Sequence, residues 1–264
     1  MRALLGALLL AVASLPALAA PCPKTLRIGF GDVPLPPMLL GNGTGFEDPP
    51  GWAVQVARDT LRRLGCQAEM VRLPGRRLLR GLESGELDFA LFFSPTAERL
   101  RSMRFPVDAA DRADAAWAPV LGHLALYGLT GSPALKSWDG RTPAAGVRVG
   151  VVAGSAQEVL ARDRRWAVEP ASSYETSVLA LRARRFELLL SPRESLPAAQ
   201  LSGEDALVEL APLVERLPYF APASRTVQAQ HPGFVTDFWR ELCHATRRRA
   251  PEARGQDCGS RPSH

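Results

Sequence analysis

Short apolar runs alternate with amphipathic segments through the first part of the chain. A short apolar run between polar or turn-forming residues predicts a buried strand, whereas apolar positions with a 3.6-residue period predict a helix. The expected elements, in chain order, are the strand Leu26–Gly31, the Gly- and Pro-rich loop 33–51, the helix Trp52–Leu64, the strand Ala68–Leu73, the helix Arg76–Leu82 and the strand Phe89–Phe93. This β-α-β-α-β order predicts a parallel, doubly wound sheet.

The same order of elements recurs further along the chain. The second set comprises the strand Val147–Val152, the helix Ala156–Arg164, the short strand Ala167–Glu169, the helix Ser173–Arg184 and the strand Phe186–Leu190. Extended segments over Trp117–Leu129 and Pro218–Ser224 can carry the chain from one unit to the other and back, and Pro232–Arg249 is the last expected helix. The repeated unit therefore predicts two α/β domains.

The domain boundaries follow from the two connecting segments. We expect the first domain to be discontinuous, with residues 20–118 and 217–264, and the second domain to span 119–216. The polar tail 251–264 is expected to be loose apart from Cys258.

The N-terminus has the pattern of a secretory signal peptide over residues 1–19. Arg2 precedes the apolar run Ala3–Leu15, and small residues follow up to Ala19, the expected cleavage site. The apolar run is too short to span a membrane, and no later run approaches about 20 apolar residues. Pro21 stands where a lipid anchor on Cys22 would need a small residue. We therefore expect a soluble, exported protein.

The composition of the chain is that of an ordinary globular protein and disfavours binding to nucleic acid. The hydrophobic fraction of 46% is ordinary for a globular protein, and the net charge is +5. The arginines are scattered, and no aromatic residues alternate with them as in a surface that stacks on bases. With export, this pattern argues against a nucleic-acid partner.

Four cysteines in an exported protein indicate two disulfides. Cys22 and Cys66 each precede a strand, and these strands are expected to be neighbours, whereas Cys243 and Cys258 are close in sequence. Three pairings are open, and we favour 22–66 with 243–258. No CxxC spacing supports a zinc site, so we expect no metal and no cofactor.

One arginine stands just past a predicted strand end. The strand Phe89–Phe93 runs into a polar loop, Ser94-Pro95-Thr96-Ala97-Glu98-Arg99. Open α/β sheets bind ligands at the carboxyl ends of their strands, where a guanidinium can fork onto a carboxylate. The alternative is a surface arginine in a loop.

Seven pieces in this order resemble the family 3 extracellular solute-binding proteins, the polar amino-acid binders of bacterial ABC importers. They are Gly51-Trp52 with Arg63-Leu64-Gly65, Leu78-Leu79, Ser84-Gly85-Glu86-Leu87-Asp88, Ser94-Pro95-Thr96-Ala97-Glu98-Arg99, Phe105-Pro106, Trp138-Asp139-Gly140 and Val147–Ser155. The resemblance covers almost the whole mature chain. It implies a periplasmic, monomeric, two-domain clamshell whose two crossover strands act as a hinge. It also implies closure on a small anionic or zwitterionic ligand and a membrane permease as partner.

The resemblance also implies binding residues. Arg99 matches the arginine that grips the ligand carboxylate, Ser94 the hydroxyl residue before it and Thr96 the threonine of the turn. Gly154 and Ser155 match the loop that presents backbone N–H groups at a helix start. Asp32, after the first strand, and Ser191, after the last strand of the second unit, complete the predicted ligand-binding set.

The chain departs from the family where the ligand ammonium would sit. Ser191 stands about where the amino-acid binders carry an acidic residue, and a neutral hydroxyl cannot neutralise a buried ammonium. Met38 replaces an aromatic lid residue, and Gly75 replaces a frequent aromatic. We therefore predict a ligand that carries a carboxylate and no amine, in preference to a standard amino acid.

Two other functions stay open. Some clamshell relatives are periplasmic enzymes of the cyclohexadienyl dehydratase type, which use a cleft carboxyl as general acid; Glu169, Glu175 and Glu194 lie near the expected rim but read as solvated charges. The histidines are far apart in the predicted fold, so no catalytic residues are assigned. The third function is a ligand sensor with a membrane signalling partner.

Overall fold

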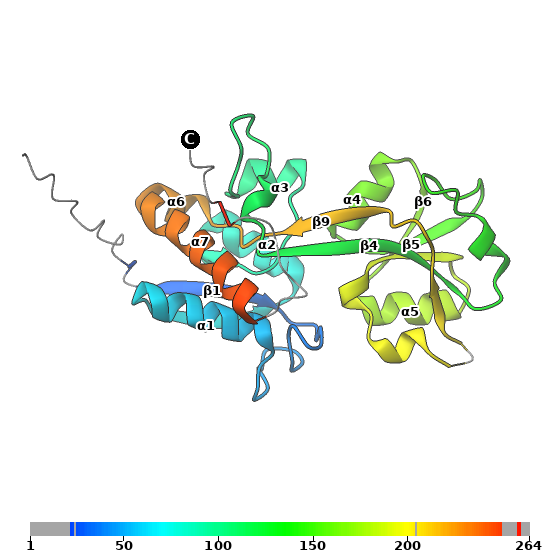
Figure 1. The fold of residues 1–264 in the computed structure, drawn as a ribbon, viewed down its shortest axis with the longest axis horizontal. Coiled ribbons are helices and arrows are strands. Elements are labelled where there is room, and N and C mark those ends of the chain that lie inside the picture. The colour runs from blue at the N-terminus through cyan, green and yellow to red at the C-terminus, as the bar shows by residue number, and fades with distance from the viewer. Residues whose placement is uncertain (1–21, 24, 204, 250–257, 260–264) are drawn as a thin grey trace, which may run out of the picture.

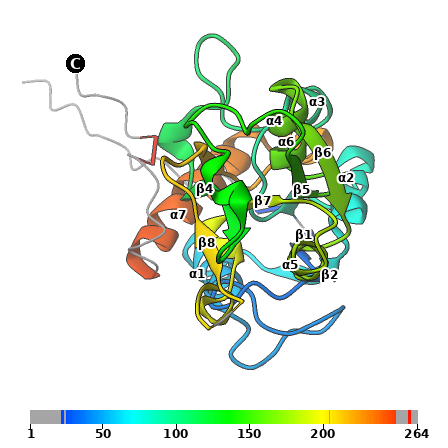
Figure 2. The ribbon, with the colours of Figure 1, turned by 90° about the vertical axis from the view of Figure 1, so that its right-hand side faces the viewer.

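The computed structural model describes residues 22–23, 25–203, 205–249 and 258–259. The predicted signal peptide, 1–19, and most of the predicted loose tail lie outside the described residues. Figure 1 shows two lobes side by side, joined by the long strands β4 and β9. Seen from the end of the second lobe, that lobe stands in front of the first (Figure 2).

The first lobe contains a three-stranded parallel sheet with the order β2-β1-β3. Its elements are β1 (Leu26–Gly31), α1 (Trp52–Leu64), β2 (Ala68–Leu73), α2 (Gly75–Ser84), β3 (Phe89–Ala90), α3 (Ala97–Ser102), α6 (Arg225–Gln230) and α7 (Pro232–Arg249). Helices α1 and α7 share one buried cluster with β1, where the Phe89 and Phe238 rings stack with centroids 4.0 Å apart. Leu78 and Leu82 of α2 belong to a separate cluster. The sheet is therefore wound on both faces.

The second lobe contains a six-stranded sheet with the order β6-β5-β7-β4-β8, and β9 also pairs with β4. The elements are β4 (Val120–Leu129), β5 (Arg148–Val152), α4 (Ala156–Asp163), β6 (Ala167–Ala171), α5 (Tyr174–Arg182), β7 (Leu188–Pro192), β8 (Leu207–Glu209) and β9 (Glu215–Tyr219). Strands β5, β6 and β7 are parallel, whereas β4 runs antiparallel to its neighbours. Alternate residues of β4 enter opposite clusters, as the period of a strand requires.

Strands β4 and β9 carry the chain between the lobes. They pair antiparallel from Val120 opposite Tyr219 to Leu124 opposite Glu215. Beyond β9 the chain lies beside the first sheet, where the Phe93 N–H donates to the Phe220 carbonyl at 2.9 Å. The residues after β9 therefore pack on the first lobe.

Both favoured disulfides are present. Cys22 and Cys66 are bonded with their Cα atoms 5.6 Å apart, and Cys243 and Cys258 with theirs 5.4 Å apart. The first bond joins the chain before β1 to the chain before β2, two strands that pair along their whole length. The second bond ties the tail to α7.

Several boundaries differ from the sequence-based predictions. The strand expected over Phe89–Phe93 pairs regularly only at Phe89–Ala90, because the next residues turn into the loop before α3. The strand expected over Phe186–Leu190 is shifted to Leu188–Pro192, which places Ser191 inside the sheet. The predictions did not include α3, α6 or β8, since each is too short to show a periodic pattern.

No helix among the described residues is long and apolar enough to cross a membrane.

Candidate ligand-binding site

Arg99 lies on the short helix α3 and not in a loop as expected. Thr96 is the N-cap of this helix, and its Oγ1 accepts the Arg99 backbone N–H at 3.2 Å. A threonine oxygen at this position satisfies an N–H group that has no partner within the helix. The cap fixes the start of α3 and so the origin of the Arg99 side chain. The residue is only 7% exposed, which excludes the alternative of a surface arginine.

The Arg99 guanidinium bridges the two lobes. Its Nη1 donates to the Ser94 carbonyl at 2.7 Å, within the first lobe. Its Nη2 donates to the Gly154 carbonyl at 2.9 Å, between β5 and α4 of the second lobe. The Phe93 ring centroid lies 5.3 Å from the guanidinium carbon.

Both hydrogen-bond acceptors of Arg99 are neutral. Among the ion pairs of the described residues, none involves Arg99. Burial lowers the pKa of Arg99 below its ordinary value, with charges at Glu98, Tyr219 and Tyr174 acting in the opposite direction. A buried cation whose hydrogen-bond acceptors are carbonyl oxygens is costly, and an incoming anion would offset that cost.

Two tyrosines lie within electrostatic reach of Arg99. Tyr174, at the start of α5, accepts a hydrogen bond from Gln157 Nε2 at 2.9 Å through its Oη. Burial raises the pKa of Tyr174, and burial together with the Tyr174 and Glu194 charges raises the pKa of Tyr219 well above its ordinary value. Arg99 acts to lower both pKa values. The two phenols therefore stay neutral hydrogen-bonding groups.

The Ser94 side chain is a buried hydroxyl close to the phenol of Tyr219. The residue is 2% exposed, and its Oγ makes no hydrogen bond of normal geometry to any described residue. Its hydroxyl also acts to lower the pKa of Tyr219, which places it close to that phenol. A buried hydroxyl without a partner is unfavourable unless a ligand or water completes it.

Glu194 and His123 form a pair beside the hinge strands. Glu194 Oε1 lies 2.8 Å from His123 Nδ1, and the His123 backbone N–H lies 3.2 Å from both carboxylate oxygens. Next to His123, a Cβ on Gly122 would lie 2.4 Å from the Tyr219 ring. Glycine at 122 therefore lets Tyr219 cross the hinge. Glu194 is exposed, as expected of a solvated charge, and it also pairs with a hinge residue.

The start of α4 presents one backbone group to Arg99 and caps its own helix with the others. Ser155 is the N-cap and its Oγ accepts the Glu158 backbone N–H at 3.2 Å, while the Gly154 N–H donates to Glu158 Oε2 at 2.7 Å. Gly154 has φ of 74°, a conformation that favours glycine. Gly154 thus presents its carbonyl to Arg99, and its N–H is already bonded. Donation of this N–H to a ligand stays a prediction that requires Glu158 to move.

Asp32 and Ser191 lie outside the contacts of Arg99 that the structure describes. Asp32 follows β1, and its charge acts to raise the pKa of Arg72. Ser191 is buried in β7 opposite Ala125, and its Oγ donates to the Pro192 carbonyl at 3.2 Å. Their roles in ligand binding stay predictions.

Sequence reasoning missed Gln157, Tyr174 and Tyr219. These residues come from α4, α5 and β9, and no motif joins them. One signal was present: the chain has only three tyrosines, and two of them lie at this site.

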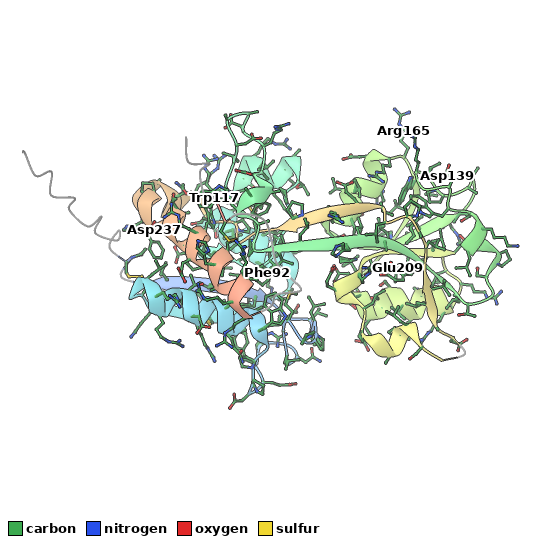
Figure 3. The ribbon with its side chains drawn as sticks, in the orientation of Figure 1. Phe92, Trp117, Asp139, Arg165, Glu209 and Asp237 are labelled. Atoms are coloured by element: carbon green, nitrogen blue, oxygen red, sulfur yellow. A yellow bond between two sulfur atoms is a disulfide. The ribbon has the colours of Figure 1, made fainter. Side chains whose placement is uncertain are left out.

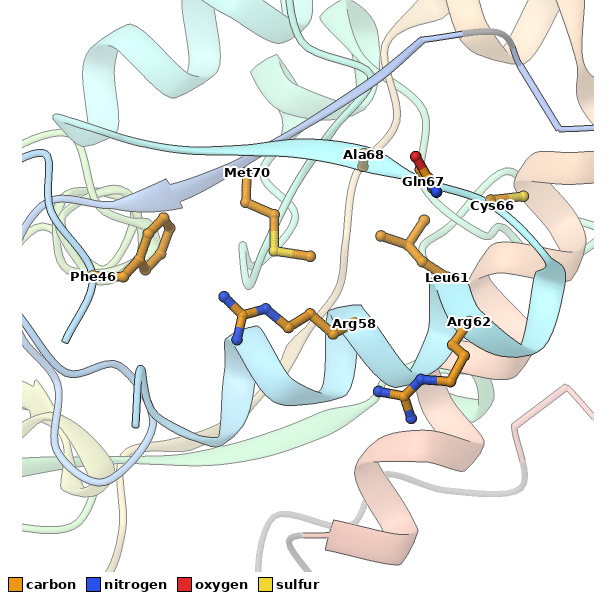
Figure 4. Close-up of a pocket in the computed structure, with 8 residues that line it drawn as sticks. All are labelled: Phe46, Arg58, Leu61, Arg62, Cys66, Gln67, Ala68 and Met70. Carbon is orange, nitrogen blue, oxygen red and sulfur yellow. The ribbon is translucent and has the colours of Figure 1, made fainter. Parts of the chain in front are cut away.

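A separate groove of about 600 Å³ lies between α1 and β2 in the first lobe. Figure 4 shows Arg58 and Met70 reaching into it from opposite walls, with Phe46 at one end. Arg58 and Arg62 are exposed, so water already solvates their charges and an anion would gain little from them. Arg99 is the stronger candidate because it is buried at the contact between the lobes. Phe92 lies on the side of the first lobe from which β4 leaves, and Glu209 lies in the second lobe (Figure 3).

Metal binding has no support in the part of the chain that the structure describes, where no three His, Cys, Asp or Glu side chains gather.

No family model and no curated protein matches the chain. Solved structures do match it. They include a mutant of the arginine-binding protein ArgBP from T. maritima, at 16% identity and a TM-score of 0.62, over 86% of this chain and 90% of that one. The GluR0 ligand-binding core from Nostoc punctiforme, in complex with L-glutamate, matches at 15% identity and 0.63, over 86% and 93%. A histidine kinase sensor domain similar to periplasmic binding proteins matches at 16% and 0.64, over 87% and 92%.

These likenesses extend over nearly the whole of each compared chain, and both lobes and the two crossover strands are present in the structure. The chain therefore has the two-domain periplasmic-binding-protein fold, and its resemblance to the family 3 solute-binding proteins is confirmed at the level of the fold.

Proposed function

We propose that the protein binds a small carboxylate-bearing solute in the cleft between its lobes, with Arg99 as the residue that holds the carboxylate. The observation that carries the proposal is a buried guanidinium that bridges the lobes and has no carboxylate partner among the described residues. Charge-assisted hydrogen bonds of this kind contribute about 1.5–3 kcal/mol each. On binding, the ligand carboxylate would replace a backbone carbonyl as a hydrogen-bond acceptor of Arg99.

The binding mode would be closure of one lobe onto the other. Ligand would dock on Arg99 and Ser94 of the first lobe, and the Gly154 turn of the second lobe would then close over it. A ligand raises the closed population only by its difference in affinity for the two states. In the closed state Arg99 contacts Gly154 of the second lobe. A carboxylate bound to Arg99 would therefore be close to groups of both lobes only in that state, which would give the closed state the higher affinity.

The location and partner follow as further parts of the proposal. The predicted signal peptide and two disulfides favour export to an oxidising compartment. There a monomeric binder would deliver its solute to an ABC-type permease. A sensing role is the second candidate, since one structural neighbour is a histidine kinase sensor domain.

An amine-free ligand is favoured over a standard amino acid by the residue that stands where the family's amino-acid binders carry an acid. Ser191 is neutral, and its hydroxyl is bonded within β7. The compared structures include proteins bound to arginine, glutamine and L-glutamate, so this chain would differ from them in its ligand.

The test is calorimetry with L-amino acids and with dicarboxylates. Replacing Arg99 by Ala should weaken binding by about 2–5 kcal/mol, or roughly 30- to 5,000-fold, because the ligand charge loses its partner. Arg101→Ala is the matched control, since Arg101 lies on the same helix and is exposed. Unchanged affinity in the Arg99 variant would refute the assignment. Tight binding of a standard L-amino acid would refute the amine-free ligand alone.

Catalysis is a separate outcome to measure. One structural neighbour is an ancestral amino acid-binding protein described as a precursor of cyclohexadienyl dehydratase. Incubation with prephenate or arogenate decides between the two functions: turnover would support an enzyme, and thermal stabilisation without turnover would support a binder.

A further inference from the structure

The polar groups gathered beside Arg99 are almost all neutral. Gln157 is 3% exposed and donates to Tyr174 Oη, and the Ser195 side chain also lies close enough to this phenol to lower its pKa. The Ser94 hydroxyl, 2% exposed, has no hydrogen bond of normal geometry to the described residues. Tyr219 lies across Gly122 at the hinge.

These groups come from both lobes and lie close to Arg99. Ser94 and Arg99 belong to the first lobe, and Gln157 and Tyr174 to the second. The Arg99 bond to the Gly154 carbonyl brings the start of α4 onto the guanidinium, and Gln157 is three residues further along. Tyr174 and Tyr219 are also close enough to Arg99 for their charges to act on its pKa.

The chemistry of these groups selects among ligands. Phenols, hydroxyls and amides can both donate and accept, so they complement a ligand hydroxyl. A ligand ammonium would need a carboxylate, and the one that acts on both tyrosines, Glu194, already accepts the His123 backbone N–H and faces its ring nitrogen. A ligand with a bare hydrocarbon chain would leave the buried polar groups without partners.

We propose that the ligand is a hydroxycarboxylic acid, whose carboxylate binds Arg99 and whose hydroxyl groups bind Tyr174, the Gln157 amide and Ser94. The inference rests on the proposed function and adds the class of ligand. The raised pKa values of the two phenols agree with it, because a neutral phenol keeps its proton to donate. Sites that hydrogen-bond a hydroxyl discriminate strongly against analogues that lack it.

The test compares acids of equal chain length that differ only in their hydroxyl or amino groups. Calorimetry would measure 2-hydroxyglutarate, glutamate and glutarate, then malate, aspartate and succinate, and then gluconate against hexanoate. The expected result is that at least one hydroxy acid binds about tenfold or more tightly than both its deoxy and its amino analogue. Equal or tighter binding of the deoxy or amino member overturns the inference.

The same measurements on Arg99→Ala keep the two proposals distinguishable. If glutarate or glutamate binds best and the variant loses that binding, the hydroxyl inference fails and the proposed function stands. If a hydroxy acid binds best and the variant binds it equally well, the role of Arg99 fails and the hydroxyl inference stands. If no probe binds, mass spectrometry identifies small molecules released from the purified protein on denaturation. A released acid that lacks hydroxyls overturns the inference, and no released acid overturns both proposals.

Tyr174→Phe tests the second half of the site directly. The substitution removes one hydroxyl and should lower the affinity of the preferred hydroxy acid about tenfold, while the affinity of its deoxy analogue stays the same. The control is Tyr127→Phe, because the Tyr127 hydroxyl bonds Glu209 in the second lobe. A purely structural role for Tyr174 would weaken both ligands equally and leave their ratio unchanged, which would overturn the assignment.

Discussion

Two buried arginines of the first lobe have the same chemistry and different surroundings. Arg72 is 2% exposed and Arg99 is 7% exposed. Each lies against an aromatic ring, Phe46 for Arg72 at 5.6 Å and Phe93 for Arg99 at 5.3 Å. Burial lowers the pKa of both. Neither forms an ion pair within 4.0 Å among the described residues.

The acceptors separate the two arginines. Arg72 donates to the carbonyls of Gly31, Leu40 and Gly45, all in β1 or the loop that follows it. It therefore ties that long loop to the sheet. Arg99 donates to one carbonyl in each lobe, so its bonds change when the lobes move apart. A buried arginine whose acceptors belong to one rigid unit stabilises that unit. A buried arginine whose acceptors belong to two units can instead respond to a change in their relative position, as ligand binding requires.

The largest expected effect is on stability, from Arg72→Met. The substitution keeps the apolar length but leaves three carbonyls without their donor, which should lower the free energy of unfolding by about 3–5 kcal/mol. Urea unfolding measures it, with the exposed Arg80→Met as control. A loss below about 1 kcal/mol would mean that Arg72 does not hold the loop, and that the two arginines do not differ in their contribution to stability.

Gly122→Ala should have the next largest effect. Its Cβ would lie 2.4 Å from the Tyr219 ring, so one of the two hinge strands has to shift. Overpacking of this kind costs about 1–3 kcal/mol. In a double-mutant cycle, Tyr219→Ala should recover most of the loss, because it removes the ring that the new methyl meets. Independent, additive effects would show that the ring and Gly122 are not coupled.

Glu158→Gln tests the turn through which the second lobe contacts Arg99. Burial acts to raise the pKa of Glu158, but the bond from the Gly154 N–H and the Arg162 charge outweigh it, so the net pKa is lowered. A lowered carboxyl pKa stabilises the fold above the unfolded value of about 4.3 and stops doing so as the pH falls through the folded value. The substitution should cost about 1 kcal/mol at pH 7.

The pH series supplies the check on that prediction. Urea unfolding of wild type and variant should differ fully at pH 5 and above, and the difference should shrink as the pH falls below about 4. A difference that stays constant down to pH 3 would show that the Glu158 charge is not involved.

The smallest expected change in stability comes from Arg99→Met. Loss of two hydrogen bonds and relief of a desolvated charge act in opposite directions, so the free energy of unfolding of the ligand-free protein should change by no more than about 1 kcal/mol. Ligand-dependent stabilisation in a thermal melt should disappear in the same variant. A loss as large as that of Arg72→Met would make Arg99 a structural residue like its counterpart.

Much of the fold could be predicted from the pattern of apolar residues. The helix Trp52–Leu64 and the strands Leu26–Gly31 and Ala68–Leu73 were predicted with the observed bounds. Long amphipathic repeats and short apolar runs carry a clear period. Six-residue helices and a three-residue strand do not, so α3, α6 and β8 were not predicted.

The candidate site could be predicted only in part. Arg99 was identified because it follows a strand that ends at the ligand-binding edge of a parallel sheet. Tyr174 and Tyr219 were not identified, since each is a single polar aromatic residue in an element of the other lobe or the hinge. For Gly154 the sequence named the turn but could not show that its carbonyl accepts a bond from Arg99 and that its N–H donates to Glu158.

The sequence by itself determined the repeated α/β unit and the arginine after the third strand, because periodicity and chain order are local properties. Only the tertiary structure decided that Arg99 is buried between two lobes, that Arg72 is buried within one, and that two tyrosines and a glutamine gather beside Arg99. Those facts depend on contacts between residues 17 to 120 positions apart, among them Gln157 with Tyr174 and Arg99 with Gly154. Such contacts follow from the packing of the lobes, which no local pattern records.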